Sequence, residues 1–460
     1  VTVGGNLYAT TDANSGAINL NQLAVGSSYG TIYLTTNGSG NATVVNDRSL
    51  ELRNAVVGGN LAATATTGNI SDIGTLTVAG TSSFTTSANN AYIILNNANA
   101  LTGAVSFNTT GSSGYALVDN GTTALIVAQS SVGGNLTLTS GHASGITDSG
   151  TVTVGGNLTA TTDANSGVIN LGTLAIDGTV ALTTNGSGNA TVVNDAGLNF
   201  AASTVGGALN ATATTGNMTD SGALTIAGTS SFTTSANNAD ITLNNTNAFT
   251  GAITLSTTGT SAHANIDGGT TALNIAASSV AGNLYLRTGN NITDSGTVTV
   301  GYGLVATTDA NNGAINLGTL AVGSTVDLTT HGSGNATVVN DAVLIIAASE
   351  VGGNLAATAT TGNILDNGVL TVAGTSSFTT SQNNADITLN NTNAFTGAVA
   401  LNTTGSTGNA LVDNGTTALN VAASTVGGNL ILTSGHASGI TDSGTVTVGG
   451  NLTATTDANS

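Results

Sequence analysis

The chain has no cysteine, proline, tryptophan or lysine, and its basic side chains are four histidines and three arginines, Arg48, Arg53 and Arg287. Without cysteine it forms no disulfide and offers no thiolate ligand to a metal ion. Only 5% of the residues are charged, against about a quarter in an average globular domain. Apolar residues still make up 39%, which favours a folded β-structure over disorder.

The few charges are almost all negative. Twenty aspartates and two glutamates against three arginines give a formal net charge of −19. Nucleic acid is therefore excluded as a partner, because binding it requires a basic patch that displaces counterions. An anionic membrane surface is disfavoured for the same reason. No apolar run of about eighteen residues or more occurs, so no transmembrane segment is predicted in this stretch.

The chain repeats itself over long intervals. VTVGGNL begins at Val1, Val152 and Val446, and the degenerate copy VTVGYGL begins at Val298. The intervals of 151, 146 and 148 residues predict three large repeats, 1–151, 152–297 and 298–445, and the start of a fourth at 446–460. Because the same motif in the same phase opens and closes the chain, we interpret it as a window of a longer repetitive protein or one unit of a continuous assembly.

A shorter period lies inside each large repeat. Cores similar to VGGNL start at Val3, Val57, Val132, Val154, Val205, Val280, Val300, Val351, Val426 and Val448. The gaps of 54, 75, 22, 51, 75, 20, 51, 75 and 22 residues are close to two, three and one multiples of a unit of about 25 residues. This spacing predicts six rungs in each repeat of about 148 residues.

The composition of the rungs indicates strands and turns. They are rich in Thr, Val, Gly and Asn and poor in Glu, Lys, Arg and Gln, which form helices. Alternation in segments such as Thr151–Val154 and Asp240–Leu243 predicts short strands with aliphatic side chains inward and Thr outward. DSG, NNGA, TGN and GSGN are turn sequences. The predicted fold is all-β, a parallel β-helix or β-solenoid with two or three strands per rung.

Two residue types receive structural places in this fold. Phe84, Phe232 and Phe378 recur at one position, which we expect at the widest part of the core or at a corner. Asparagine pairs recur as well, and we expect their amides to stack and bond one another along the axis. These pairs are Asn89–Asn90, Asn237–Asn238, Asn244–Asn245 and Asn390–Asn391.

The recurring VGGNL, the GxLTVxG and GxITDSGT turns and the Asn/Thr/Gly/Ala bias without cysteine resemble the repeat region of filamentous-haemagglutinin-like exoproteins. These are large bacterial surface and secreted adhesins, and the resemblance covers essentially the whole chain. It implies a right-handed β-helix, export to the cell surface, and adhesion or matrix building. The secretion domain typical of the two-partner members is not visible in this sequence.

Aspartates recur in columns, for which turn formation through bonds to nearby backbone is the favoured interpretation. The columns are Asp12/163/309/457, Asp47/195/341, Asp72/220/366, Asp119/267/413 and Asp148/294/442. The alternative is calcium, because Asp47 and Asp72 are 25 residues apart and would stack ~4.8 Å apart if 25 residues made one rung. The calcium-binding nonapeptide GGxGxDxUx is absent. No cofactor is therefore assigned, and calcium is kept as a hypothesis.

Catalysis has little support. Polysaccharide-cleaving sites combine clustered carboxylates with a basic residue, but lysine is absent and Arg48 and Arg53 become Ala196 and Ala201 in the second repeat. No HxH or HExxH occurs, no GxSxG elbow has correctly spaced partners, and no P-loop lysine follows the glycine pairs. His142, His263, His331 and His436 are therefore interpreted as turn or surface residues. No catalytic, cofactor-binding or metal-binding residue is assigned, and the chain is predicted not to be an enzyme.

The predicted function is a structural stalk or fibre segment of a secreted or surface-exposed bacterial protein, serving adhesion, biofilm matrix or extracellular filament formation. The expected partners are copies or a continuation of the same repetitive chain and cell-surface or matrix glycans. The main alternative is a carbohydrate-binding or carbohydrate-active β-helix. Less favoured are a calcium-rigidified spacer and, from outward pairs such as Thr151/Thr153 and Thr137/Thr139, an ice-binding surface.

Overall fold

The computed structural model describes residues 1–12, 14–26, 30–309 and 312–457, so the last three residues of the expected fourth repeat lie outside it. Every regular element in the described residues is a strand. Inward and outward side chains alternate as expected, for example along Leu61–Ala65, and the strands pair in parallel with strands one turn away. The predicted all-β parallel solenoid is confirmed. The chain divides into two compact units, Val1–Thr229 and Ser230–Ser460.

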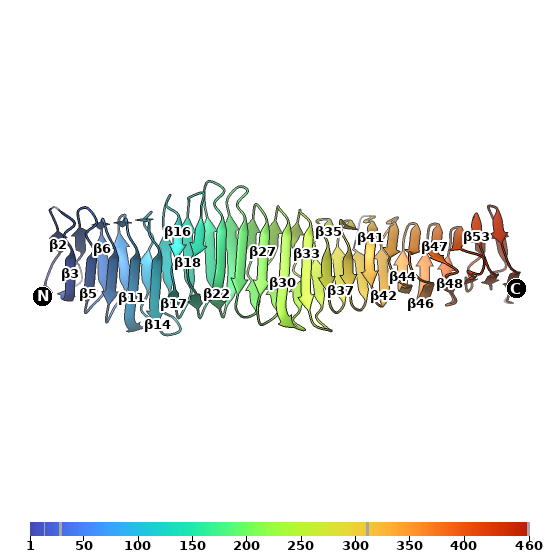
Figure 1. Ribbon diagram of the computed structural model, residues 1–460, viewed down its shortest axis with the longest axis horizontal. Helices are drawn as coiled ribbons and strands as arrows, with labels where there is room; N and C mark the ends of the chain where they lie inside the picture. Colours follow the sequence, from blue (N-terminus) through green and yellow to red (C-terminus); the bar gives the residue numbers. More distant parts are fainter. Residues whose placement is uncertain (13, 27–29, 310–311, 458–460) are drawn as a thin grey trace. The chain divides into compact units, whose positions relative to one another are not determined.

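In the first unit the chain passes back and forth between two parallel sheets (Figure 1). Sheet 1 contains β1 (Thr2–Val3), β3 (Ile18–Val25), β5 (Ala42–Asn46), β8 (Leu61–Ala65), β11 (Ser82–Asn89), β14 (Val105–Thr110), β16 (Leu125–Val127), β17 (Ser130–Val132), β19 (Ile146–Asp148), β20 (Val152–Val154), β22 (Ile169–Ile176), β24 (Ala190–Asn194) and β27 (Leu209–Ala213). Sheet 2 contains β2 (Leu7–Thr10), β4 (Ile32–Thr35), β6 (Leu50–Arg53), β7 (Val56–Val57), β9 (Ile70–Ile73), β10 (Thr77–Val78), β12 (Ile93–Leu95), β13 (Ala100–Leu101), β15 (Ala116–Asp119), β18 (Leu136–Ser140), β21 (Leu158–Thr162), β23 (Thr179–Thr184), β25 (Leu198–Phe200), β26 (Ser203–Val205), β28 (Met218–Asp220) and β29 (Leu224–Ile226).

The second unit has the same alternation. Its sheet 1 contains β30 (Ser230–Asn237), β33 (Ile253–Thr258), β35 (Leu273–Ile275), β36 (Ser278–Val280), β38 (Ile292–Asp294), β39 (Val298–Val300), β41 (Ile315–Val322), β43 (Ala336–Asn340), β45 (Leu355–Ala359), β47 (Ser376–Asn383), β50 (Val399–Thr404), β52 (Leu419–Val421), β53 (Ser424–Val426), β55 (Ile440–Asp442) and β56 (Val446–Val448). Its sheet 2 contains β31 (Ile241–Leu243), β32 (Ala248–Phe249), β34 (Ala264–Asp267), β37 (Leu284–Thr288), β40 (Leu304–Thr308), β42 (Thr325–Thr330), β44 (Leu344–Val351), β46 (Ile364–Val372), β48 (Ile387–Leu389), β49 (Ala394–Phe395), β51 (Ala410–Asp413), β54 (Leu430–Ser434) and β57 (Leu452–Thr456).

A turn of the solenoid takes fewer residues on average than the spacing of the sequence motifs predicted. The in-register partners Ala42 with Leu61, Thr2 with Ala24, and Leu7 with Ile32 give turns of 19, 22 and 25 residues. After Val3 in β1 the chain crosses sheet 1 at β3, β5, β8, β11 and β14, then at the pairs β16–β17 and β19–β20, and so reaches Val154. These are seven turns, so each takes roughly 21 to 22 residues on average. The predicted rung of about 25 residues, with six rungs in each large repeat, is wrong.

The VGGNL motif caused this error because it serves both sheets. It forms the corner from a strand end in one sheet to a strand start in the other. Val57 ends β7 in sheet 2 and Leu61 begins β8 in sheet 1, whereas Val132 ends β17 in sheet 1 and Leu136 begins β18 in sheet 2. The long gap between these two copies is thus three and a half turns, and the gaps of intermediate length are two and a half.

The half turns in these gaps depend on the order of two kinds of crossing. A crossing is one passage of the chain along one sheet, and the two kinds alternate along most of the chain. One is a single straight strand, such as β5 or β8. The other is bent, and consists either of two short strands, such as β9 with β10, or of one longer strand with a register shift, such as β22. Two straight strands follow each other at β4–β5, β14–β15 and β23–β24 in the first unit and at β33–β34, β42–β43 and β50–β51 in the second. The bent crossings change sheets at each of these places. We call these places phase switches.

A buried asparagine bonds the preceding bent strand at a phase switch. The Asn194 side chain at the end of β24 accepts a hydrogen bond from Ile176 N (2.8 Å) and donates to Ile176 O (3.1 Å) and Gly197 O (2.7 Å). The amide thereby replaces a strand neighbour for the second half of β22. The same two-way bonding to one backbone residue is made by Asn46 on Val25, Asn120 on Leu101, Asn340 on Val322 and Asn414 on Phe395.

The expected amide ladders take a different form. Asn90 and Asn238 have φ near 62°, a left-handed conformation that asparagine tolerates better than most residues. The side-chain oxygen of Asn90 accepts a bond from Ser113 N, and that of Asn238 accepts from Thr260 N and Ser261 N. At Asn90 and Asn238, amide–backbone bonds between turns therefore stand where amide–amide bonds were expected.

The recurring phenylalanines are fully buried and lie in pairs. The ring centroids are 6.2 Å apart in Phe84–Phe107, 5.8 Å in Phe232–Phe249 and 5.6 Å in Phe378–Phe395. In the first repeat the second ring is Phe107, which lies in sheet 1, and the facing position in sheet 2 is occupied by Leu101. In the later repeats the second ring comes from sheet 2, and Leu255 and Leu401 lie in register beside Phe232 and Phe378.

Candidate functional site

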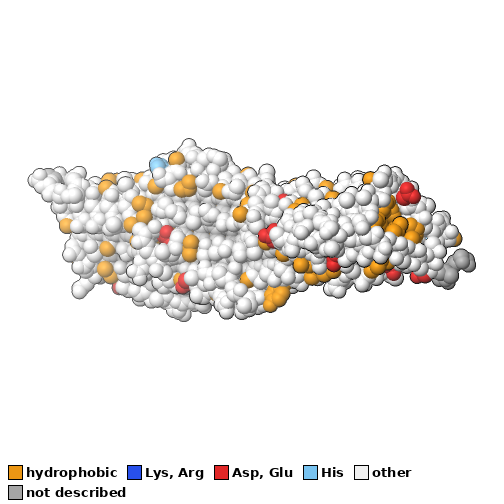
Figure 2. Space-filling view, turned by 45° about the vertical axis from the view of Figure 1, so that its right-hand side comes forward, with side chains coloured by type: hydrophobic (Ala, Val, Ile, Leu, Met, Phe, Trp, Pro, Cys, Tyr) orange, Lys and Arg blue, Asp and Glu red, His pale blue; other side chains and the backbone are white. Residues whose placement is uncertain are grey.

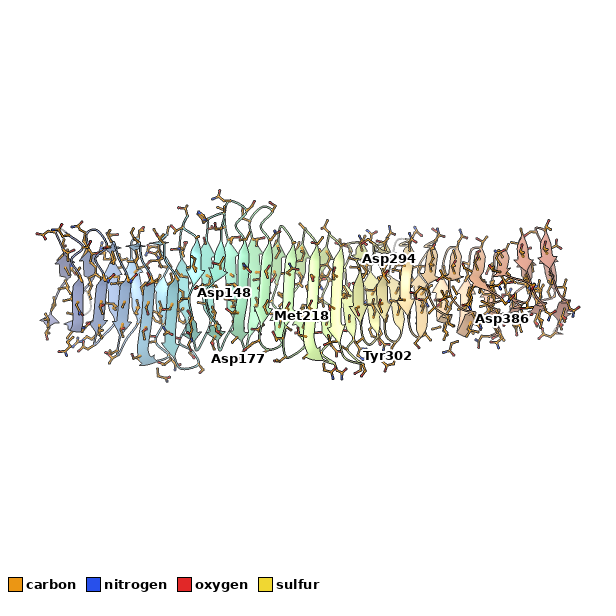
Figure 3. All side chains as sticks on the ribbon, viewed as in Figure 1. Asp148, Asp177, Met218, Asp294, Tyr302 and Asp386 are labelled. Atoms are coloured by element: carbon orange, nitrogen blue, oxygen red, sulfur yellow. The ribbon has the colours of Figure 1, made fainter. Side chains whose placement is uncertain are left out.

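Aspartates of two columns bond the neighbouring turn. Asp72 in β9 is buried, and its carboxylate accepts bonds from Asn96 N (3.1 Å), Asn97 N (3.3 Å) and Asn99 Nδ2 (2.8 Å). The Asp366 carboxylate has the same partners two large repeats later. Asp148 and Asp294, labelled in Figure 3, each accept two backbone N–H bonds and one threonine hydroxyl bond from the following turn. These aspartates bond the following turn and not the nearby backbone that the favoured interpretation predicted. Local bonds of the predicted kind are made by Asp119, Asp267 and Asp413, each of which accepts from the glycine N–H two residues later.

The aspartate pair on which the calcium hypothesis rested does not stack. Register places Asp72 beside Leu52 on the preceding turn, and the Asp47 carbonyl accepts a hydroxyl bond from Thr67. The premise of two carboxylates one turn apart is therefore wrong, because the turn that ends at Asp72 begins at Leu52 and takes 20 residues. In the part of the chain that the structure describes, no group of three or more His, Asp or Glu side chains could hold a metal ion.

The histidines lie in turns. The Nδ1 atoms of His142 and His436 accept bonds from the backbone N–H two residues later, both at 3.0 Å. His263 Nδ1 accepts from Asn283 N (2.8 Å), and His331 Nδ1 lies 2.7 Å from Thr308 O. Each ring thus contacts backbone at Nδ1. His142 and His436 bond within their own loops, whereas His263 and His331 contact an adjacent turn.

Sheet 2 of the first unit carries an outward row of threonines in successive turns. Register aligns Thr139, Thr161, Thr183, Thr204 and Thr225. The neighbouring row Thr137–Thr159 ends at Ala181. Stacked β-branched side chains stabilise adjacent strands, so the single row has a structural explanation. The paired rows on which ice binding was based extend over only two turns here.

One hollow in the second unit brings charged side chains together. A cavity of about 760 Å³ opens among the loops after β31, β34, β37 and β40. We call it the loop groove. Its lining consists of Thr246, Asn247, Ala248, Asp267, Gly269, Thr270, Thr271, Arg287, Gly289, Asn290, Asn291, Asp309 and Gly313.

The charged groups of the loop groove are ordered by one another and by backbone. Arg287 Nε lies 2.9 Å from both carboxylate oxygens of Asp309. Asp267 is the in-register neighbour of Arg287, and its Oδ1 accepts a bond from Gly269 N (2.7 Å). The hydrogen bond to Asp309, and then the negative charges of Asp309 and Asp267, raise the pKa of Arg287. The Arg287 side chain is 62% exposed, so the ion pair orients the groups more than it stabilises the fold.

A shortened loop accompanies the hollow. Three residues, 289–291, join β37 to β38, whereas five residues join the equivalent strands in the other repeats, 141–145 and 435–439. Arg287 is replaced there by Thr139 and Thr433. No site was predicted at Arg287 from the sequence. The signal that could have found the groove is LRTGNNITDSG, two residues shorter than LTSGHASGITDSG.

Asp327 in β42 makes stability depend on pH. It pairs in register with Val305, and desolvation raises the pKa of its carboxyl group. A raised folded-state pKa favours the folded state at pH below the unfolded value of about 3.9, and this contribution is lost as pH rises through the folded value. Asp327→Ala, which introduces the residue found at Ala181, should therefore raise the melting temperature at pH 7 and have less effect near pH 3. Equal effects in calorimetry at both pH values would contradict this account.

Parallel turns stacked on an aliphatic core define a β-solenoid repeat protein. The chain belongs to a family described as Repeats of unknown function (DUF5649), which matches residues 39–108, 187–256, 261–319, 333–402 and 407–460. No curated protein and no solved structure matches. No helix in the described residues is long and apolar enough to cross a membrane.

The family matches share the spacing of the phase switches. Successive matches begin at 187 and 261, and again at 333 and 407, so the same interval separates the members of both pairs. Asn46, Asn120 and Asn194 follow one another at this interval, as do Asn340 and Asn414; Gly268 occupies the intervening position. The sequence unit is therefore three and a half turns, half of the large repeat, and each unit begins on the opposite sheet from the last.

Proposed function

We propose that the chain is a non-enzymatic structural segment of a stalk or fibre of a secreted or surface-exposed bacterial protein, with adhesion or matrix formation as its role. The observation that carries the proposal is how the polar side chains are used. The buried asparagines, aspartates of three columns and the histidines bond backbone of their own or an adjacent turn. Side chains of the types that perform catalysis serve here to join turns.

The surface supports this role. Acidic side chains lie singly among uncharged surface on the face shown in Figure 2. A net charge of −19 with so few basic groups keeps neighbouring copies apart and soluble. A surface of threonine, serine and asparagine also offers hydroxyl and amide groups to matrix glycans. The same composition gives proteases specific for basic residues only three sites, which suits an exposed protein.

Immunogold labelling of intact cells that make the protein tests the proposal. We expect gold particles on the cell surface or on extracellular filaments before permeabilisation, and loss of the label after brief treatment of whole cells with proteinase K. An antibody to a cytosolic enzyme, which should label only permeabilised cells, is the control. Labelling confined to the cytosol would contradict the proposed role.

A further inference from the structure

We infer that the loop groove of the second unit is a binding site for a neutral oligosaccharide. This inference goes beyond the structural role, because it concerns a site in one repeat and holds wherever the protein is located. It rests on the shape of the groove, the chemistry of its lining, its charge, and the contrast with the equivalent loops of the other repeats.

The groove has the dimensions of a small-ligand site. Its lining comes from the loops of four consecutive turns, from Thr246 to Gly313. With turns about 4.8 Å apart, the first and fourth loops are separated by roughly 14 Å. The volume of about 760 Å³ lies within the range of about 300–1,000 Å³ typical of ligand pockets. A short oligosaccharide laid across the turns fits this length.

The lining matches the hydrogen-bonding character of sugar hydroxyls. A hydroxyl group both donates and accepts, so a polyol requires acceptors and donors side by side. Asp267 and Asp309 supply only hydrogen-bond acceptors, and Arg287 supplies only donors. The side-chain amides of Asn290 and Asn291 each supply an acceptor oxygen and a donor NH₂ group. Because Arg287 and Asp309 already bond each other, the groove presents a planar donor–acceptor pair that is oriented before a ligand arrives.

The charge of the groove disfavours other classes of ligand. Two aspartates and one arginine leave a net charge of −1 in a chain of −19, so anions are repelled. A divalent cation would meet the guanidinium group of Arg287. No aromatic side chain lines the groove, which disfavours a flat apolar ligand. A neutral, hydroxyl-rich molecule satisfies the lining without these penalties.

The other repeats provide matched comparisons inside the same chain. At the equivalent position they have threonine in place of Arg287 and a loop two residues longer. In the first repeat that longer loop includes His142, whose Nδ1 accepts a bond from Ser144 N. Arg287→Thr and replacement of Asn290–Asn291 by the sequence HASG therefore convert the groove toward loops that the fold already accommodates.

The test uses a glycan microarray that carries neutral glucose-, galactose-, mannose- and N-acetylglucosamine-based oligosaccharides beside uronate-containing, sialylated and sulfated ones. The unchanged chain should bind neutral glycans. Titration calorimetry with the best-bound neutral glycan should show at least a tenfold weaker affinity for Arg287→Thr and for the loop replacement. Arg53→Ala, which removes an arginine outside the groove and introduces the residue found at Ala201, should bind like the unchanged chain.

Circular dichroism and melting temperature should be the same in all four proteins, so that lost binding is not lost folding. The inference is overturned if no neutral glycan binds, if acidic glycans bind more tightly than neutral ones, or if both groove variants bind as well as the unchanged chain. None of these results would affect the structural role, because that role is tested by cellular location.

Discussion

Replacing Asn194 with alanine is expected to destabilise the first unit by about 3–5 kcal/mol, because the substitution leaves Ile176 N, Ile176 O and Gly197 O without their side-chain partner. Ile176 is buried, and each unsatisfied buried group costs about 1–3 kcal/mol. Urea denaturation should show a lower midpoint, and amide hydrogen exchange should accelerate most at Ile176.

The matched control is Asn189→Ala, five residues earlier on an exposed turn. The Asn189 side-chain oxygen accepts one bond, from Ala208 N, in a position that water can replace. Its loss should cost about 1 kcal/mol or less. If both alanine variants lowered the denaturation midpoint equally, the buried asparagine would not have the special role assigned to it.

Exchanging Leu101 and Phe107 in the first repeat should show strong coupling between the two substitutions in the free energy of unfolding. Phe107→Leu alone leaves a cavity, and Leu101→Phe alone overfills the core, each at a cost of about 1–3 kcal/mol. The double variant reproduces the arrangement of Phe249 with Leu255 and of Phe395 with Leu401. It should be within about 1 kcal/mol of the unchanged chain, because the total core volume is conserved.

A double-mutant cycle from denaturation curves measures this coupling, which should be about 2 kcal/mol or more in favour of the double variant. A cycle between Leu101→Phe and a distant core change, Phe200→Leu, is the control and should be additive. Additive effects in the first cycle would show that the two positions do not share one space.

The sequence predicted the strands better than it predicted their stacking. Alternation of aliphatic and hydroxyl side chains is a local property, so segments such as Leu61–Ala65 could be recognised directly. The turn length could not, because Val57 and Val132 carry the same corner motif on opposite sheets. Spacing between identical motifs counts whole repeats only when each copy occupies the same place in the turn.

The candidate site and the phase switches were missed for related reasons. The sequence prediction concerned Asp47, whereas its neighbour Asn46 is the residue buried at the switch. A buried amide and an exposed amide look alike in a chain this rich in asparagine. The loop groove arises from a two-residue difference beside Arg287, and only the fold shows that the loops on either side then border a hollow. Handedness and cellular location remain predictions.

The turn length and the in-register stacking can be tested most directly with engineered cysteines, because the chain has none of its own. Thr64 and Thr85 are in-register neighbours on adjacent turns, and their side chains point outward. Adjacent strands lie about 4.8 Å apart, within the range of about 4.4–6.8 Å between Cα atoms that a disulfide spans. The control pair, Thr64→Cys with Asn89→Cys, has the longer separation in sequence that the motif spacing predicted for one rung.

Under mild oxidation the pair at Thr64 and Thr85 should close an intramolecular disulfide rapidly and nearly completely, and the control pair should not. Closure of the Thr64–Asn89 pair in preference to the Thr64–Thr85 pair would contradict the solenoid described here.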